Sequence, residues 1–318
     1  MKKDPVKPVK KDELTMSPLT TAATASPTPR PTISPRLLEG RTVLVTGGGR
    51  GLGRLFAATL AEAGAQLVLT GRDPRALRET AELLQVRNTR VLAVPADVTD
   101  PAAMPKVVEE AVDSFGTIDV LVNNAGVTGP IGPFWELDRD EWQDTVDVNL
   151  MGTVRTCHAV LPVMTARRAG RVINITSEAG RHRWPHLSAY SVSKAAVNKL
   201  TENLARELRP HGVTMLSYHP GLLELGLTKD GMDTYPTGDV WRDRSIEWFM
   251  AQRREGRFTD AEHSARTLLR LAAGEADHLS GQYLTPDSDL AVPSGLSDPS
   301  DSSDRPGRSD GSGALAAS

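Results

Sequence analysis

Short apolar segments alternate with amphipathic ones along most of the chain, and this alternation constrains the fold more than any other feature. Strands are predicted for the apolar runs at residues 41–46, 66–70, 90–94, 119–123, 171–176, 213–218 and 282–285. Helices are predicted where apolar residues recur at helical spacing, over 51–63, 74–84, 100–115, 139–167, 187–209 and 260–273. Continuous apolar strands need cover on both faces. We therefore expect an α/β protein with a single doubly wound parallel sheet and helices on both faces.

The helix predicted at 100–115 carries signals at its start. Asp100 is a favoured N-cap residue, and Pro101 suits the first turn. Pro105 lies further along the same segment and is expected to kink or restart the helix, because proline lacks a backbone N–H.

Composition divides the 318 residues into a body and two tails. Residues 1–37 and 288–318 are rich in small and polar residues and proline and lack periodicity, so we expect disordered N-terminal and C-terminal extensions. Residues 38–287 are then long enough for one domain with a full core.

Charge and cysteine content exclude several classes of partner. The formal net charge of −3 gives no reason to expect nucleic acid or an anionic membrane as partner. The single cysteine, Cys157, excludes an internal disulfide or a cysteine zinc cluster, and we interpret it as a small core residue. No apolar run approaches the roughly 20 residues that cross a bilayer, and the N-terminus lacks a secretory h-region. We expect a cytoplasmic protein.

A glycine-rich turn, TGGGRGLG, connects the first predicted strand to the first predicted helix. Gly47, Gly51 and Gly53 follow the spacing G-x-x-x-G-x-G. Glycines let a backbone approach a pyrophosphate, which then rests against the N–H groups at the helix start. The turn therefore predicts a dinucleotide site.

The end of the second predicted strand indicates which dinucleotide binds. An unphosphorylated ribose usually meets an Asp or Glu there. This chain has Thr70-Gly71-Arg72, with no carboxylate before Asp73. Arg72 and Arg50, the latter within the glycine turn, offer planar forks that suit a 2′-phosphate. NADP(H) is therefore the preferred cofactor, and NAD(H) remains the alternative.

Tyr190 and Lys194 are four residues apart, so on a helix both side chains lie on one face. Ser177 stands thirteen residues earlier, directly after a predicted strand. A phenol titrates near ~10, and a neighbouring ammonium lowers that pKa. The stretch therefore predicts proton transfer at a carbinol oxygen. Tyr and Lys at this spacing also occur on many surface helices, so the prediction depends on the dinucleotide turn upstream.

Several motifs in order together resemble the short-chain dehydrogenase/reductase family over about residues 38–287. They are TGGGRGLG, Asp97-Val98, Asn123-Asn124-Ala125-Gly126, Asn149, Ser177, Tyr190-x-x-x-Lys194 and Pro220-Gly221. The resemblance implies a Rossmann-like fold and an oxidoreductase that uses a nicotinamide cofactor.

The resemblance also implies individual catalytic roles. Tyr190 would be the general acid/base, Lys194 would hold the nicotinamide ribose and lower the pKa of Tyr190, and Ser177 would orient the carbonyl. Asn149 would anchor a water chain that relays protons to solvent, although an asparagine in a helix can also bend it or satisfy a buried carbonyl.

Cofactor contacts follow from the same resemblance. The residues are Gly47, Arg50, Gly51, Leu52, Gly53, Arg72, Asp97, Val98, Asn124, Tyr190, Lys194 and Leu223. Asp97 and Val98 would flank the adenine, and the backbone of Leu223 would meet the carboxamide. Asn123 is expected to tie neighbouring strands together rather than to touch ligand.

The region after Pro220-Gly221 departs from the family pattern. Many members place a threonine three or four residues beyond the glycine to bond the carboxamide, whereas Thr228 here comes seven residues later. Either Thr228 reaches by a longer loop or backbone groups replace that contact. The segment 229–257 that follows contains several aromatic residues. It is expected to be a mobile lid, with ordinary helix-core contacts as the alternative.

His182 and His186 are spaced like a pair of metal ligands, but Pro185 and the lack of a third ligand argue against a metal. We expect both histidines, with Arg183 and Trp184, to shape the rim of the pocket, and we expect no bound metal.

The predicted function is an NADP(H)-dependent oxidoreductase that interconverts a small-molecule carbonyl compound and a secondary alcohol. The alternatives are an NAD-dependent alcohol dehydrogenase and a non-catalytic dinucleotide-sensing protein on the same fold. The resemblance further implies a homodimer or homotetramer that packs through the predicted helices at 139–167 and 187–209.

Overall fold

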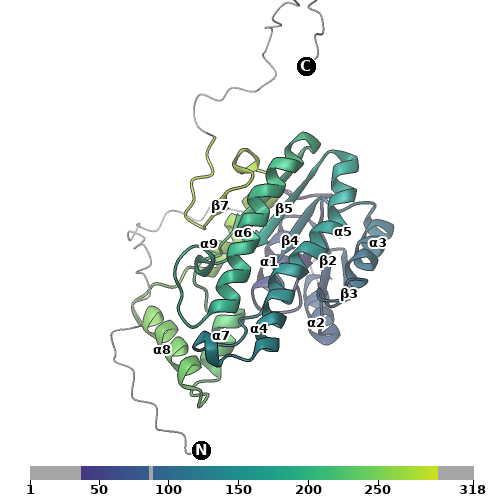
Figure 1. Ribbon diagram of the computed structural model, residues 1–318. Helices are drawn as coiled ribbons and strands as arrows, with labels where there is room; N and C mark the ends of the chain where they lie inside the picture. Colours follow the sequence, from purple (N-terminus) through teal and green to yellow (C-terminus); the bar gives the residue numbers. More distant parts are fainter. Residues whose placement is uncertain (1–36, 86–88, 293–318) are drawn as a thin grey trace, which may run out of the picture.

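A computed structural model describes residues 37–85 and 89–292, which form one parallel sheet between two layers of helices (Figure 1). The seven strands are β1 (Thr42–Thr46), β2 (Gln66–Gly71), β3 (Val91–Pro95), β4 (Val120–Asn123), β5 (Gly170–Ile175), β6 (Val213–Tyr218) and β7 (Tyr283–Leu284). Their order in the sheet is β3-β2-β1-β4-β5-β6-β7, and the neighbours pair in parallel. The predicted fold class is confirmed.

The helices form two layers because successive strand residues point to opposite faces. They are α1 (Gly51–Glu62), α2 (Pro74–Gln85), α3 (Ala103–Phe115), α4 (Arg139–Val146), α5 (Gly152–Arg167), α6 (Ser188–Leu208), α7 (Gly226–Asp233), α8 (Val240–Arg254) and α9 (Ala261–Ala273). In β1, Val43 and Val45 belong to the core that α1, α2 and α9 cover, whereas Leu44 belongs to the core under α3, α5 and α6. Both faces of the sheet are therefore buried.

The strand order reverses between β1 and β4, and this position determines where a ligand binds. Connections leave the two strands toward opposite faces, so a crevice opens outside their carboxyl ends. Thr46 joins the two turns there, since its Oγ1 accepts from the N–H of Asn124 at 2.9 Å and of Ala125 at 3.0 Å. The glycine turn after β1 and the Asn124 turn after β4 thus form one rim.

Two helix predictions need correction. The helix expected from Asp100 begins at Ala103, because the Asp100 carboxylate accepts from Ala102 N–H at 2.8 Å and closes a turn before the helix. Pro105 is consequently the third helical residue, where a missing N–H leaves no intrahelical bond unmade. Pro105 therefore lies in the first turn of α3 and interrupts no helix, which corrects the prediction of a kink or restart there.

The helix expected at 139–167 is not uniform. Between α4 and α5, residues Asp147–Met151 form a π-helical turn, which holds one extra residue per turn. Its central residue is Asn149, whose side chain is fully buried. The widened turn therefore changes the direction of this one side chain relative to a regular α-helix.

The packed body continues past residue 287, where the sequence placed its boundary. Leu290 is only 3% exposed and joins the core beside α9. The remainder of the two predicted tails, residues 1–36 and 293–318, lies outside the described residues. Within the described ranges, none of the helices is both long and apolar enough to cross a membrane.

Candidate active site

One large cavity at the carboxyl ends of the strands brings the predicted site residues together. Its lining includes Gly47, Arg50, Gly51, Leu52, Gly53, Arg72, Asp97, Val98, Asn124, Ser177, Tyr190, Lys194 and Leu223. Asn149 is the predicted site residue that is missing from this lining in the described part of the chain. The cofactor residues and the catalytic residues therefore share a single cavity, although they come from turns far apart in the sequence.

The glycine turn has the shape that a pyrophosphate needs. A Cβ atom on Gly53 would lie 2.1 Å from the carbonyl oxygen of Gly47, and one on Gly47, at φ 66°, would lie 2.9 Å from Asn124 Nδ2. In the described structure, the Arg50 side chain makes no capping hydrogen bond at the start of α1, and the first turn holds no acidic residue. The free N–H groups of α1 therefore suit an anion.

The far end of the cavity, beside β2, is suited to a 2′-phosphate. Arg72 is exposed and has no ion-pair partner within residues 37–85 and 89–292. The carboxylate of Asp73 accepts from Arg75 N–H at 2.9 Å at the start of α2, so that oxygen is already occupied. Arg54 donates hydrogen bonds to the Gly49 carbonyl oxygen and to Thr80 Oγ1, which stabilise the glycine turn. The residues present fit NADP(H).

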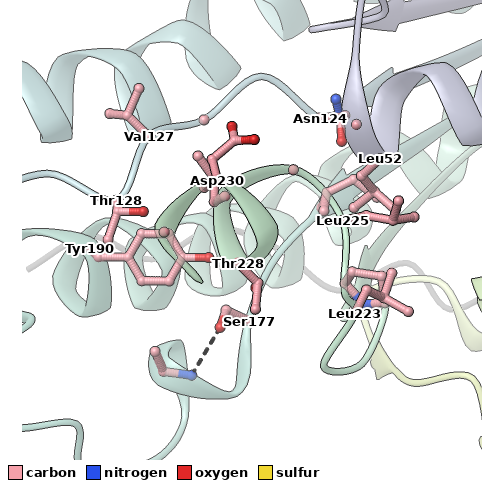
Figure 2. Close-up of a pocket in the computed structure, with 18 of the residues that line it drawn as sticks. Leu52, Asn124, Val127, Thr128, Ser177, Tyr190, Leu223, Leu225, Thr228 and Asp230 are labelled. Carbon is pink, nitrogen blue, oxygen red and sulfur yellow. Dashed lines mark hydrogen bonds between the residues drawn. The ribbon is translucent and has the colours of Figure 1, made fainter. Parts of the chain in front are cut away.

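Tyr190 and Lys194 lie on α6 and line the cavity. Ser177, which follows β5, lies close to the Tyr190 hydroxyl (Figure 2). The Lys194 ammonium donates to the carbonyl oxygen of Ile175 at 2.8 Å and lies 5.7 Å from the centroid of the Tyr190 ring. Lys194 is only 5% exposed. Two of its three N–H donors remain for a ligand in the cavity.

Gly180 allows the Ser177 loop to approach α6 closely. A Cβ atom on Gly180 would lie 2.7 Å from the backbone carbon of Lys194, so a larger residue would push the loop away. Ser177 begins the short helix at Glu178–Gly180, and its Oγ accepts from Ala179 N–H at 3.2 Å. The loop therefore holds the serine hydroxyl near the Tyr190 hydroxyl.

The pKa values of this pair differ from the expectation. Burial raises the pKa of Tyr190, and a hydrogen bond with Ser177 lowers it in part. Burial also lowers the pKa of Lys194 to about 8. Desolvation of the phenolate is the largest influence on the Tyr190 pKa, and a lowering of that pKa by Lys194 stays a prediction. At neutral pH, Tyr190 thus stays protonated, which is the form that donates a proton.

The Asn149 side chain links the Val127 backbone to α6 by hydrogen bonds behind the cavity lining. Its Oδ1 accepts from Val127 N–H at 2.8 Å, and its Nδ2 donates to the Val127 carbonyl at 2.9 Å and to Ser193 Oγ at 3.0 Å. Ser193 in turn donates to the Tyr190 carbonyl at 2.7 Å. The Asn149 side chain is therefore fully engaged in positioning, and its role in a water chain stays a prediction.

Sequence reasoning missed Ser193 and Asp230. A serine three residues after Tyr190 on a helix can donate back to the Tyr190 carbonyl, so this signal was available for Ser193. Asp230 pairs with Arg50 across 180 residues of sequence, and no local pattern predicts that contact.

The structure also shows the contacts of Asn123, Cys157 and the two histidines. Asn123 donates to Asn174 at 2.9 Å, which ties β4 to β5 as expected. Cys157 is 2% exposed, and burial raises the pKa of its thiol to about 12, which agrees with a core residue. His182 pairs with Glu178 at 2.9 Å, and the His186 ring stacks on Trp241 with 4.2 Å between centroids. The two histidines thus have separate partners.

The segment predicted as a lid, residues 229–257, begins within α7 and contains α8. Figure 2 shows α7 crossing the cavity, with Thr228 and Asp230 among its lining residues. Trp248 of α8 packs edge-on against Trp184, with 5.0 Å between ring centroids. Met232 of α7 and Ile246 of α8 are buried, at 8% and 4% exposed. The segment therefore covers the cavity and also makes helix contacts, while its mobility stays a prediction.

Comparison with known proteins places the chain in a family. The model of the short chain dehydrogenase family matches residues 41–235. The 3-oxoacyl-(acyl-carrier-protein) reductase FabG of Salmonella typhimurium is 32% identical over 246 residues, which cover 77% of this chain and 95% of the relative. The chain belongs to the short-chain dehydrogenase/reductase family of NAD(P)-dependent oxidoreductases.

Similar solved structures hold both nicotinamide dinucleotides. NAD+-bound xylitol dehydrogenase superposes with a TM-score of 0.71 and 27% identity, over 78% of this chain and 98% of that one. An actinorhodin polyketide ketoreductase with NADPH superposes with a TM-score of 0.70 and 29% identity, over 77% and 95%. One of these similar structures is thus NAD+-bound and the other holds NADPH.

Proposed function

We propose that this protein is an NADP(H)-dependent reductase that converts a small-molecule carbonyl compound to a secondary alcohol. The observation that carries the proposal is the shared cavity, in which Tyr190, Ser177 and Lys194 stand beside the dinucleotide turn. A nicotinamide dinucleotide supplies the hydride when it is bound. The chain's own residues then have to bind the carbonyl oxygen and deliver one proton to it.

Ser177 and Tyr190 share that task. The Ser177 hydroxyl donates to the carbonyl oxygen and orients it, and the Tyr190 phenol transfers its proton to the same oxygen as negative charge develops there. The buried Lys194 ammonium, fixed by its bond to Ile175, stabilises the phenolate that remains and binds ribose hydroxyls. The Tyr190 phenol is protonated at neutral pH, so it can supply the proton that reduction of a carbonyl requires.

The preference for NADP(H) rests on charge at the end of β2. Arg72 is exposed and has no ion-pair partner within the described ranges, and Arg50 lies in the glycine turn. The Asp73 carboxylate accepts a hydrogen bond from the Arg75 N–H at the start of α2. A guanidinium binds a phosphate dianion with two parallel hydrogen bonds. If the protein bound NADH as tightly as NADPH, this part of the proposal would be wrong.

The test replaces Tyr190 by Phe and follows NADPH oxidation with a panel of carbonyl compounds. Turnover should fall by about 10²–10⁴, the usual contribution of a general acid, while NADPH binding persists. The matched control is Tyr235→Phe, which removes an exposed hydroxyl bonded to Glu247 and should leave turnover unchanged. Full activity in the Tyr190 variant would contradict the mechanism. NADPH binding without turnover in the wild type on every carbonyl would favour a dinucleotide sensor.

We propose in addition that the protein is a homodimer or homotetramer that packs through the helices at 139–167 and 187–209. Val192 on α6 is 51% exposed and Met151, just before α5, is 36% exposed, so both carry apolar surface outward. Burial of such side chains against a second copy is favourable. A monomer in a sizing measurement at micromolar concentration would refute this assembly.

A further inference from the structure

An ion pair connects the two sides of the cavity at its cofactor end. Arg50 Nη1 lies 2.9 Å from Asp230 Oδ2, and both residues line the cavity. Arg50 precedes the first residue of α1, and Asp230 lies in the middle of α7, which crosses the cavity in Figure 2. The pair therefore occupies the arginine that the proposed function assigns to the 2′-phosphate.

Backbone packing fixes α7 in the position that makes this pair. A Cβ atom on Gly51 would lie 2.8 Å from the Cα atom of Gly226, so the first residues of α1 and α7 are in direct contact. Asp230 follows Gly226 by one helical turn and reaches Arg50 from there. The contact thus results from the packing of α7 on the glycine turn and joins a helix of the lid segment to the cofactor turn.

The neighbouring charges on α7 have other partners. Asp233 pairs with Lys229 within the helix, one turn away. Within the described residues, Asp230 is consequently the acidic residue of α7 that pairs with the glycine turn. Arg72, on the other side of the expected phosphate position, has no ion-pair partner within those ranges. Arg50 is therefore the phosphate-binding arginine whose availability depends on a second residue.

We infer that Asp230 is a specificity-determining residue that weakens NADP(H) binding by competing with the 2′-phosphate for Arg50. This inference rests on the proposed function. The two side chains of the pair are 71% and 51% exposed, so solvent screens their attraction and the pair can exchange partners. A phosphate monoester carries more negative charge than a carboxylate, so it can replace Asp230 as the partner of Arg50. A ribose without the phosphate makes no demand on Arg50, so NAD(H) binding is unaffected.

The experiment measures dissociation constants of NADPH and NADH by cofactor fluorescence with the full chain. Asp230→Asn keeps the shape of the side chain and removes its charge. It should bind NADPH about threefold more tightly, within the range of an exposed ion pair, and should leave NADH binding unchanged. Asp233→Asn is the matched control on the same helix and should change neither constant, because Asp233 pairs with Lys229.

Two further variants separate this inference from the proposed function. Arg50→Ala should weaken NADPH binding and not NADH binding, and adding Asp230→Asn to it should have no further effect. If Arg50→Ala leaves both constants unchanged, the assignment of Arg50 to the 2′-phosphate is wrong and the inference fails with it. If Arg50→Ala acts as expected but Asp230→Asn leaves NADPH binding unchanged, weakens it, or tightens NADH equally, only the inference about Asp230 is overturned.

Discussion

The two sides of the cavity are held together in different ways. On the catalytic side, Lys194 is 5% exposed and Asn149 and Ser193 are fully buried, and each makes hydrogen bonds of 3.0 Å or less to another element or to the Tyr190 backbone. On the cofactor-phosphate side, the pair Arg50–Asp230 joins α7 to the glycine turn with side chains that are 71% and 51% exposed. A second exposed pair, Arg253–Glu224, joins α8 to the loop before α7.

The contrast reflects what each side has to do. Proton transfer needs a donor within a few tenths of an ångström of its position, and only buried groups with all their partners satisfied hold such geometry. Phosphate binding and release need cations that can change partners, and exposed ion pairs of small net stability allow this. Variants on the two sides should therefore change the free energy of unfolding by different amounts, in line with their burial.

The largest effect on stability is expected from the buried charge of Lys194. Burial lowers the pKa of Lys194 from its ordinary 10.5 to about 8, so between these values the unfolded chain binds more protons than the folded one. Stability then rises with pH through this window. Relative to Lys194→Met, the wild type should gain up to ~2 kcal/mol between pH 8 and 9.5.

Urea unfolding of both proteins at the two pH values measures this gain, and the variant accounts for all other titrating groups. Parallel pH dependence of the two proteins would show that the Lys194 ammonium is solvated in the folded state. The catalytic side would then be less dry than its burial indicates.

An intermediate effect is expected from two serines on α6. Ser193 connects Asn149 to the Tyr190 carbonyl, whereas the buried hydroxyl of Ser191 has no partner within the described residues. Ser193→Ala should lower the free energy of unfolding by ~1 kcal/mol and also lower kcat without raising KM. Ser191→Ala, the matched control, should be neutral, since no hydrogen bond is lost.

Thermal unfolding and steady-state kinetics of both serine variants test this expectation. A loss of stability with unchanged kcat in Ser193→Ala would reduce the residue to a structural role. Equal effects in the two variants would contradict a positioning role for the hydrogen bonds between Asn149, Ser193 and the Tyr190 carbonyl.

The smallest effect is expected from the exposed pair that joins α8 to the loop before α7. Arg253 and Glu224 lie 3.0 Å apart and are 58% and 43% exposed. Glu224→Gln should change the free energy of unfolding by less than ~1 kcal/mol, and less still at high salt. A large loss of unfolding free energy in urea would mean that the lid segment is attached as firmly as the catalytic side. The two sides would then not differ in how strongly they are held.

Much of the fold follows from local sequence. The alternation of apolar and amphipathic runs predicts the sheet, because a strand such as Leu67–Leu69 that is apolar at every position needs helices on both faces. The motifs after β1, β4 and β5 lie at one edge of the sheet, because the carboxyl ends of parallel strands meet there. The cavity lining shows them together.

Features that depend on contacts between distant segments were not predictable in this way. The π-helical turn at Asn149 depends on the fit of its amide between Val127 and Ser193, which come from different parts of the chain. The raised pKa of Tyr190 depends on how much of the phenol is buried, whereas the four-residue spacing to Lys194 implied the opposite direction.

The sequence by itself determined the order of the functional motifs along the chain. A dinucleotide turn comes first, Ser177 follows a later strand, and Tyr190 and Lys194 lie one helical turn apart. Tertiary structure decided which of these groups are charged and which are already bonded. The partner of Arg50 lies 180 residues away on α7, and the packing of Gly51 against Gly226 brings it there. Local patterns encode secondary structure, whereas desolvation and long-range ion pairs depend on the folded arrangement of the whole chain.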